Sequence, residues 1–173
     1  MGFTLVLGGA RSGKSTFAQG AAEAAAARSA TPPIAIVTAQ IYDEEMADRV
    51  LKHQAERGDV WRTLEAPVAL PKAIAALKSD DIAVVDCMTL WLTNIMLGDH
   101  DIAVQTEALL AALEQSQARI WLVSNEVGWG IVPDNALARR FRDEAGRLNQ
   151  RLAAKADHAV LIVAGMKLDL TRA

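Results

Sequence analysis

The chain has 173 residues, 51% of them hydrophobic, and a formal net charge of −3, so we expect one domain over residues 1–173 and no basic field for nucleic acid. The single cysteine, Cys87, excludes an internal disulfide. Because the N-terminal segment lacks the regions of a signal peptide and the apolar runs are short or broken by charges, we expect a cytoplasmic protein without stable membrane insertion.

Short apolar runs alternate with longer periodic segments along the chain. The runs predict strands at 3–7, 34–38, 81–87, 118–126 and 158–165, and an extended piece at 61–67. The longer segments predict helices at 14–30, 44–57, 88–97, 102–116 and 135–156. On the last helix, Leu137, Phe141, Leu148 and Leu152 form an apolar stripe. Buried strands separated by helices indicate an α/β fold with a mostly parallel central sheet and helices on both faces.

The first strand leads into GGARSGKS, which fits the phosphate-binding pattern GxxxxGK[ST]. Its glycines allow the backbone N–H groups to turn inward, and the start of the following helix adds partial positive charge. Lys14 can reach the β- and γ-phosphates of a nucleotide, and the Ser15 hydroxyl can ligate Mg²⁺. An ordinary glycine-rich turn is the alternative, and Arg11 either contacts a phosphate or faces solvent. The predicted nucleotide-binding residues of the loop are Gly8, Gly9, Ala10, Arg11, Ser12, Gly13, Lys14 and Ser15.

A second Mg²⁺ ligand is expected at the end of the strand IAVVD. Asp86 lies there, where the ligand crevice of an open parallel sheet is found. Its carboxylate suits a magnesium site, directly or through water. The alternative is that Asp86 caps the helix that begins at Met88. Cys87 beside it is interpreted as a small buried residue rather than a reactive thiol.

The predicted helix at 44–57 places Arg49, His53 and Arg57 on one ridge, at positions i, i+4 and i+8. Two guanidinium groups beside an imidazole could meet a triphosphate, and a neutral histidine could then attack phosphorus. The alternative is a surface helix with intrahelical ion pairs and an incidental histidine. Spacing alone favours that alternative.

Five stretches now point to a family: GGARSGKS, then RVLKHQAER followed by WRTLEAP, then VVDCMTLWLTN, SNEVGWGIVPDN and ARRFRDEAGRLNQRLA. Together they resemble the bifunctional adenosylcobinamide kinase / adenosylcobinamide-phosphate guanylyltransferase family of cobalamin biosynthesis. The resemblance spans about residues 5–165. Its most specific parts are NEVGxGIVP, with Trp129 at x, and the helix histidine followed by WRTLE. One departure is that Gly58 follows Arg57, where the family often has proline.

The resemblance implies two transfers at one nucleotide region. First, the γ-phosphate of ATP or GTP passes to the hydroxyl of the aminopropanol arm of adenosylcobinamide. Second, a histidine that matches His53 attacks the α-phosphate of GTP, pyrophosphate leaves, and the guanylyl-histidine gives GMP to adenosylcobinamide phosphate. The product is adenosylcobinamide-GDP. The resemblance also implies a P-loop NTPase fold of RecA-like type and a homotrimer.

The same resemblance extends the predicted site. Lys14 and His53 are the predicted catalytic residues, and Ser15 and Asp86 the predicted Mg²⁺ ligands. Outside the phosphate loop, the implied nucleotide contacts are Thr38, Ala39, Gln40, Gln54, Arg57, Glu65 and Asp86.

Two other classes of protein stay open from the sequence. One is a monofunctional small-molecule P-loop kinase in which His53 is structural, and the other is a RecA-like nucleotide-binding module. Asn125 and Glu126 either line the corrinoid side or hold their loop, and Trp129 packs on the corrinoid or on another subunit. The arginines of the last helix are interpreted as a solvated face or a subunit interface.

Overall fold

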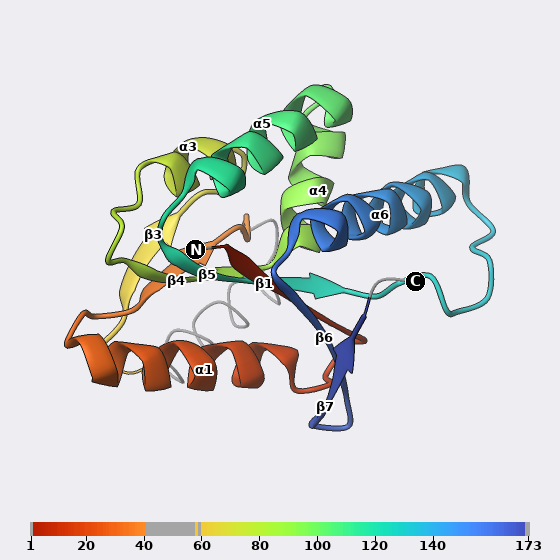
Figure 1. Ribbon diagram of the computed structural model, residues 1–173. Coiled ribbons are helices and arrows are strands. Elements are labelled where there is room, and N and C mark those ends of the chain that lie inside the picture. The colour runs from red at the N-terminus through yellow and green to blue at the C-terminus, as the bar shows by residue number, and fades with distance from the viewer. Residues whose placement is uncertain (1, 41–57, 59, 172–173) are drawn as a thin grey trace.

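The computed structural model describes residues 2–40, 58 and 60–171 (Figure 1). The predicted helix at 44–57, with His53, Gln54 and Arg57, lies outside these residues. The strands are β1 (Phe3–Gly8), β2 (Ile34–Val37), β3 (Arg62–Glu65), β4 (Ile82–Asp86), β5 (Arg119–Asn125), β6 (His158–Val163) and β7 (Met166–Leu170). The helices are α1 (Lys14–Ser29), α3 (Leu70–Ala75), α4 (Met88–Leu97), α5 (Ile102–Gln115) and α6 (Ala136–Lys155).

The strands form one sheet in the order β3-β2-β4-β5-β1-β6-β7. Every neighbouring pair is parallel except β6 and β7, which pair antiparallel. Parallel strands need helices as crossovers, and the continuous apolar runs of β1, β2 and β4 suit strands that are covered on both faces. The predicted α/β fold with a mostly parallel sheet is confirmed.

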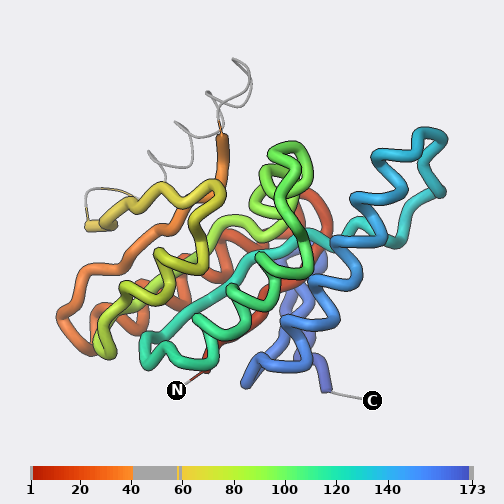
Figure 2. The backbone as a smooth tube through the Cα atoms, turned by 90° about the horizontal axis from the view of Figure 1, so that it is seen from above, coloured from red at the N-terminus to blue at the C-terminus, as the bar shows by residue number. Residues whose placement is uncertain are grey.

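Helices cover both faces of the sheet. In Figure 1, α1 lies below the sheet, and α3, α4, α5 and α6 lie above it. Figure 2 shows α3, α5 and α6 side by side over that upper face. Successive strand residues point to opposite faces, so Val84 and Val123 pack toward α1 while Val85 and Leu122 pack toward the four upper helices. The largest buried side chain, Trp91 of α4, lies in the upper core.

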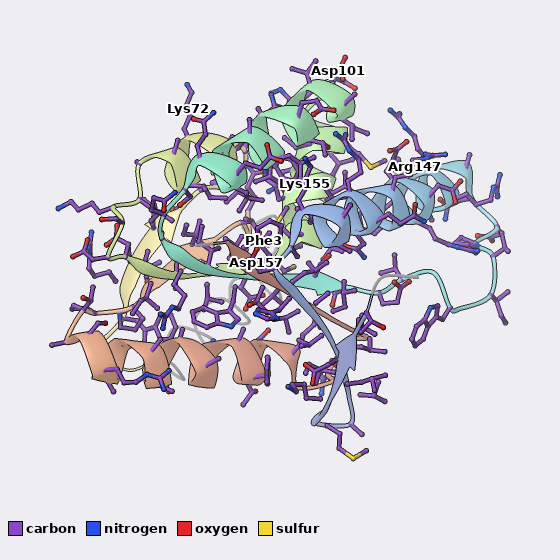
Figure 3. All side chains as sticks on the ribbon, viewed as in Figure 1. Phe3, Lys72, Asp101, Arg147, Lys155 and Asp157 are labelled. Carbon is purple, nitrogen blue, oxygen red and sulfur yellow. The ribbon has the colours of Figure 1, made fainter. Side chains whose placement is uncertain are left out.

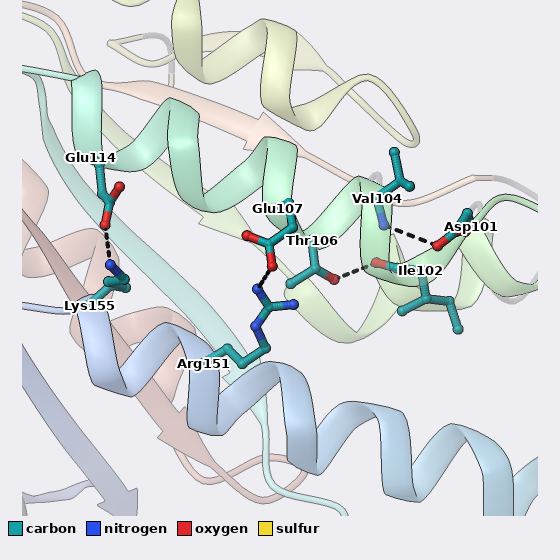
Figure 4. Close-up of polar contacts among 8 residues, drawn as sticks. All are labelled: Asp101, Ile102, Val104, Thr106, Glu107, Glu114, Arg151 and Lys155. Atoms are coloured by element: carbon teal, nitrogen blue, oxygen red, sulfur yellow. Dashed lines mark hydrogen bonds and ion pairs between the residues drawn. The ribbon is translucent and has the colours of Figure 1, made fainter.

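Helices α5 and α6 are joined by surface ion pairs. Arg151 and Lys155 of α6 contact Glu107 and Glu114 of α5, as Figure 4 shows. These side chains are partly exposed, so each pair contributes roughly 0–1 kcal/mol, and the apolar contacts beneath them hold the helices together. Within the described part of the chain, no helix is long and apolar enough to cross a membrane.

Three features differ from the expectations. The short helix α3 and the strand β7 were not predicted, and Leu137 does not belong to the apolar stripe of α6. Leu148 and Leu152 are buried and Phe141 is partly buried, but 55% of Leu137 is exposed. The reason is that α6 extends beyond the sheet at its N-terminal end, so the first turn has no core beneath it (Figure 1).

Candidate active site

The phosphate loop connects β1 to α1 and is constrained at two glycines. Gly13 has φ of +96°, a conformation that L side chains rarely adopt, and it occupies the N-cap position of α1. At Gly8 a Cβ atom would collide with the Ser12 hydroxyl and lie 2.7 Å from the carbonyl oxygen of Ile162. The pattern glycines are therefore required by this backbone, and the loop has the strand-loop-helix context that the motif needs.

The turn between β6 and β7 lies against this loop. Gly165 N donates to the carbonyl oxygen of Ser12 at 2.8 Å, and a Cβ on Gly13 would lie 3.3 Å from the Cα of Gly165. Gly9, Ala10 and Arg11 are exposed, by contrast, so the open side of the loop is available to a ligand.

Lys14 points back across the loop. Its Nζ donates to the carbonyl oxygen of Gly9 at 2.9 Å, and the side chain is buried. Burial lowers the pKa of Lys14 from its ordinary value of 10.5, and the neighbouring Cys87 and Asp86 act against that shift. An amine held beside exposed loop N–H groups and an aspartate is arranged to neutralise phosphate oxygens.

Asp86 ends β4, two strands from the phosphate loop in the sheet order, with β5 between. Register places it beside Val37 of β2 and Val123 of β5, at the carboxyl edge where the loop begins. The N-cap position of α4 is Cys87, so Asp86 lies one residue before the helix cap, and its choice between metal ligand and cap stays a prediction. Burial raises the pKa of the Cys87 thiol, which suits the interpretation of Cys87 as a small buried residue.

Oxygen donors for a magnesium ion lie at this edge. The Ser15 hydroxyl is in the first turn of α1 and the Asp86 carboxylate is close enough to Lys14 to affect its pKa. Among the described residues, no group of three or more His, Cys, Asp or Glu side chains could hold a metal. Mg²⁺ bound with a nucleotide does not need such a group, since phosphates and water supply most of its ligands. The residues present therefore fit Mg²⁺ bound together with a triphosphate.

Thr38 joins the ends of β2 and β4. Its hydroxyl donates to the carbonyl oxygen of Cys87 at 2.7 Å and accepts from Cys87 N at 2.9 Å. Asn94 of α4 donates to the carbonyl oxygens of Thr38 and Pro67, at 2.8 and 2.9 Å. Thr38 is fully buried, and its hydroxyl holds the ends of β2 and β4 together. Ala39 and Gln40, which follow it in the chain, are half-buried. Nucleotide contact by these three residues stays a prediction.

The end of β5 lies between the loop and Asp86. Asn125 pairs with Gly8 in the register, and its amide donates to the Thr89 hydroxyl at 2.7 Å. Glu126 N donates to the carbonyl oxygen of Gly8 at 3.0 Å, and its carboxylate accepts from Gly128 N at 2.7 Å. Both side chains thus hold the edge and its loop together, which was one of the two expectations for them.

The remaining residues that the sequence singled out are more exposed to solvent. Glu65 is exposed at the end of β3, in register with Val37, and so belongs to the same edge of the sheet. Trp129 and Ile131 in the following loop are 76% and 98% exposed, and Trp129 remains open to either expected partner.

Two of the three histidines in the sequence are described, and neither lies at this edge. His158 begins β6, at the amino edge of the sheet. His100 follows α4 and lines an outer cavity between α5 and α6. His53 is the third, and its prediction as the nucleophile is untested by the described residues.

The parallel α/β sheet, the glycine-rich loop from its first strand into its first helix, and the aspartate at the same edge define a P-loop NTPase-like protein. Within this class, the sequence pattern of one family, cobinamide kinase / cobinamide phosphate guanyltransferase, matches residues 4–170. The chain belongs to this family.

Three curated relatives span nearly the whole chain. The bifunctional adenosylcobalamin biosynthesis protein CobP of Pseudomonas aeruginosa is 46% identical, over 96% of this chain and 95% of the relative. The bifunctional adenosylcobalamin biosynthesis proteins CobU of Salmonella typhimurium and Escherichia coli are 43% and 39% identical, each over 94% of this chain and 96% of the relative.

Proposed function

We propose that the chain is a bifunctional transferase of cobalamin biosynthesis. It phosphorylates adenosylcobinamide with ATP or GTP and then transfers GMP from GTP to adenosylcobinamide phosphate. Family membership over residues 4–170 supports both activities. The observation that carries the proposal is the placement of Lys14 between the phosphate loop and Asp86, at the edge of the sheet where the nucleotide would bind.

In the kinase step, the loop and Lys14 hold the β- and γ-phosphates, and the corrinoid hydroxyl attacks the γ-phosphorus. The P–O bond to the nucleoside diphosphate breaks as the new ester bond forms, and the hydroxyl proton is released. Positioning and charge neutralisation supply most of the catalysis in such transfers. Ser15 and Asp86 would hold Mg²⁺, which neutralises phosphate charge when bound.

In the guanylyl step, the neutral imidazole of His53 attacks the α-phosphorus of GTP and pyrophosphate leaves. A phosphate oxygen of adenosylcobinamide phosphate then displaces the histidine, giving adenosylcobinamide-GDP and the free enzyme. The placement of the other two histidines away from the carboxyl edge supports His53 as the nucleophile. Thr38, Ala39, Gln40, Gln54, Arg57 and Glu65 complete the proposed nucleotide site.

The proposed partners follow from the two reactions. They are adenosylcobinamide, its phosphate, and ATP or GTP, and the proposed location is the cytoplasm. We further propose that the chain acts as a homotrimer. The exposed apolar residues of the β6–β7 hairpin, among them Met166 and Leu168, support self-association.

Incubation with α-labelled GTP tests the proposal. The wild-type protein should retain label after denaturation, and the adduct should survive base and be released by acid, as a phosphoramidate does. The His53→Asn variant should lose this label but keep measurable γ-phosphate transfer, because a kinase step needs no protein nucleophile.

The control is His100→Asn, since His100 lies outside the proposed site. Labelling of His53→Asn with the same acid lability would move the nucleophile to another histidine. A wild-type protein that transfers γ-label without retaining α-label would be a monofunctional kinase, and one that does neither would be a nucleotide-binding module.

A further inference from the structure

Helix α6 carries five arginines, and one of them differs from the rest. Three have partners: Arg139 donates to the carbonyl oxygens of Pro133 and Asp134, Arg147 pairs with Glu144, and Arg151 pairs with Glu107. Arg140 is exposed. Arg142 is half-buried, and its Nη1 is shielded from solvent with no hydrogen-bond partner among the residues that the structure describes.

The side of α6 that carries Arg142 faces the end of β5. Asn149, seven residues later and therefore on nearly the same side of the helix, is buried there. Its side chain accepts from the Ser124 hydroxyl at 2.6 Å and donates to the carbonyl oxygen of Asn125 at 3.2 Å. Ala145, between the two, is also buried.

The direction of the chain places Arg142 at the carboxyl edge of the sheet. β5 and β6 are both parallel to β1, so α6 returns antiparallel to β5 as the crossover between them. Seven helical residues correspond to about 10 Å along the axis. Arg142 therefore lies about 10 Å from Asn149 along the helix axis. This position is beyond the last residue of β5 and above the segment that follows β5.

That segment belongs to the candidate active site. Glu126 is bonded to Gly8 at the start of the phosphate loop, and its carboxylate accepts from Gly128 N. Among the described acidic residues nearest in the sequence, Glu144 pairs with Arg147 and Asp143 is exposed. A buried guanidinium N–H without a partner is costly, and such groups are rare unless a ligand or water completes them.

We infer that Arg142 binds a phosphate oxygen of a substrate at the carboxyl edge of the sheet, opposite the phosphate loop. Guanidinium groups suit this role because they stay charged and present several N–H donors in a plane. The phosphate is either the terminal one of the nucleotide or the one carried by adenosylcobinamide phosphate. This inference rests on the proposed function and adds a catalytic residue to it.

The test compares Arg142→Met and Arg142→Lys with the wild type and with Arg147→Met as a matched control. Arg147 is on the outer side of α6, and 64% of its side chain is exposed (Figure 3). The kinase rate is measured first. The second step is measured separately, by adding adenosylcobinamide phosphate to protein already labelled with α-labelled GTP.

A contact with the terminal phosphate predicts that Arg142→Met lowers the kcat of the kinase step by about 100-fold or more. A contact with the corrinoid phosphate predicts instead a rise of similar size in the KM of the second step. Either result supports the inference, with Arg142→Lys partly restoring activity. In both cases the Tm of Arg142→Met should equal or exceed that of the wild type, because a shielded guanidinium N–H without a partner among the described residues has been removed.

Two results would overturn the inference. One is that both steps of Arg142→Met stay within about three-fold of the wild type. The other is a clear fall in Tm with activity reduced equally in Arg142→Met and Arg142→Lys, which is the behaviour of a structural residue. A wild-type protein inactive in both steps would instead refute the proposed function itself.

Discussion

At the scale of single residues, Lys14 combines a charge with burial. Only 8% of the residue is exposed, and removal from water lowers its pKa below the ordinary value of 10.5. Without nucleotide, the protonated form of this amine is therefore less favourable in the folded protein than in the unfolded chain. A bound triphosphate would reverse that balance by placing negative charge beside it.

Replacing Lys14 with Met should abolish both transfers, since both need the triphosphate held by the loop. The nucleotide-free variant should be equally stable or more stable by about 1 kcal/mol at pH 7. The Lys14 amine binds its proton more tightly in the unfolded chain than in the folded protein. The free energy of unfolding of the wild type therefore rises with pH between the lowered pKa of Lys14 and 10.5. The stability difference between the variant and the wild type should consequently shrink as pH approaches 10.

Thermal unfolding at several pH values measures this difference. The control is Lys72→Met, because Lys72 is exposed on α3 (Figure 3) and its removal should leave both activities and the pH trend unchanged. A Lys14→Met protein that melts several degrees lower at pH 7 would show that the amine stabilises the loop.

Sequence alone identified the loop residues because their pattern is local: the glycines, Lys14 and Ser15 lie within eight positions. Asp86 was identifiable because it ends an apolar run. Arg142 was not, since five arginines on one helix look alike in sequence. Which of them turns inward depends on how α6 packs over β5, and that packing is set by residues far away in the chain.

At the scale of elements, the carboxyl ends of β2, β4 and β5 are connected by buried polar side chains. The Thr38 hydroxyl bonds both backbone groups of Cys87, and Asn125 donates to the Thr89 hydroxyl next to them. Hydrogen bonds of this kind keep loop ends in one geometry, which a phosphate site and a metal site at the same edge both require.

Substituting Thr38 with Val keeps the side-chain shape and removes the hydroxyl. Two buried backbone groups of Cys87 then lose a partner, and we expect a loss of about 2–4 kcal/mol in the free energy of unfolding. For a chain of this size the Tm should fall by roughly 4–12 °C. Denaturant or thermal unfolding provides the measurement.

Thr31→Val is the matched control, because the Thr31 hydroxyl makes one exposed bond, to the carbonyl oxygen of Ser29 at 3.4 Å. Its effect should stay within about 0.5 kcal/mol. Equal Tm changes in the two variants would mean that the bonds of Thr38 to Cys87 contribute nothing to stability.

Most described elements could be predicted from apolar runs and helical periodicity, to within one or two residues at each end. α3 was missed because it has only six residues, with a proline in its first turn, and so shows no full helical repeat. β7 is exposed along its whole length, so its sequence lacks the continuous apolar run from which the buried strands were predicted. It exists through pairing with β6 across a two-residue turn, in which Ala164 and Gly165 both have positive φ.

At the scale of the whole molecule, the β6–β7 hairpin forms one exposed edge of the sheet. β7 is an edge strand, and its Met166, Leu168 and Leu170 pair with Val163, Leu161 and Ala159 of β6. Val160 and Ile162 point toward α1, so these six side chains share the opposite face. Met166 and Leu168 are 69% and 57% exposed, and an exposed apolar edge strand usually indicates an interface.

This apolar face predicts where the proposed homotrimer is held together. Leu168→Lys places a charge at its centre, and burial of one leucine contributes roughly 1.5–3 kcal/mol, so association should weaken by more than about ten-fold. Light scattering coupled to size exclusion should give three times the chain mass of 18.5 kDa for the wild type and a smaller species for the variant. Lys167→Gln, on the other face of β7, is the control and should keep the wild-type mass. A variant that keeps the wild-type mass would exclude this face as the interface.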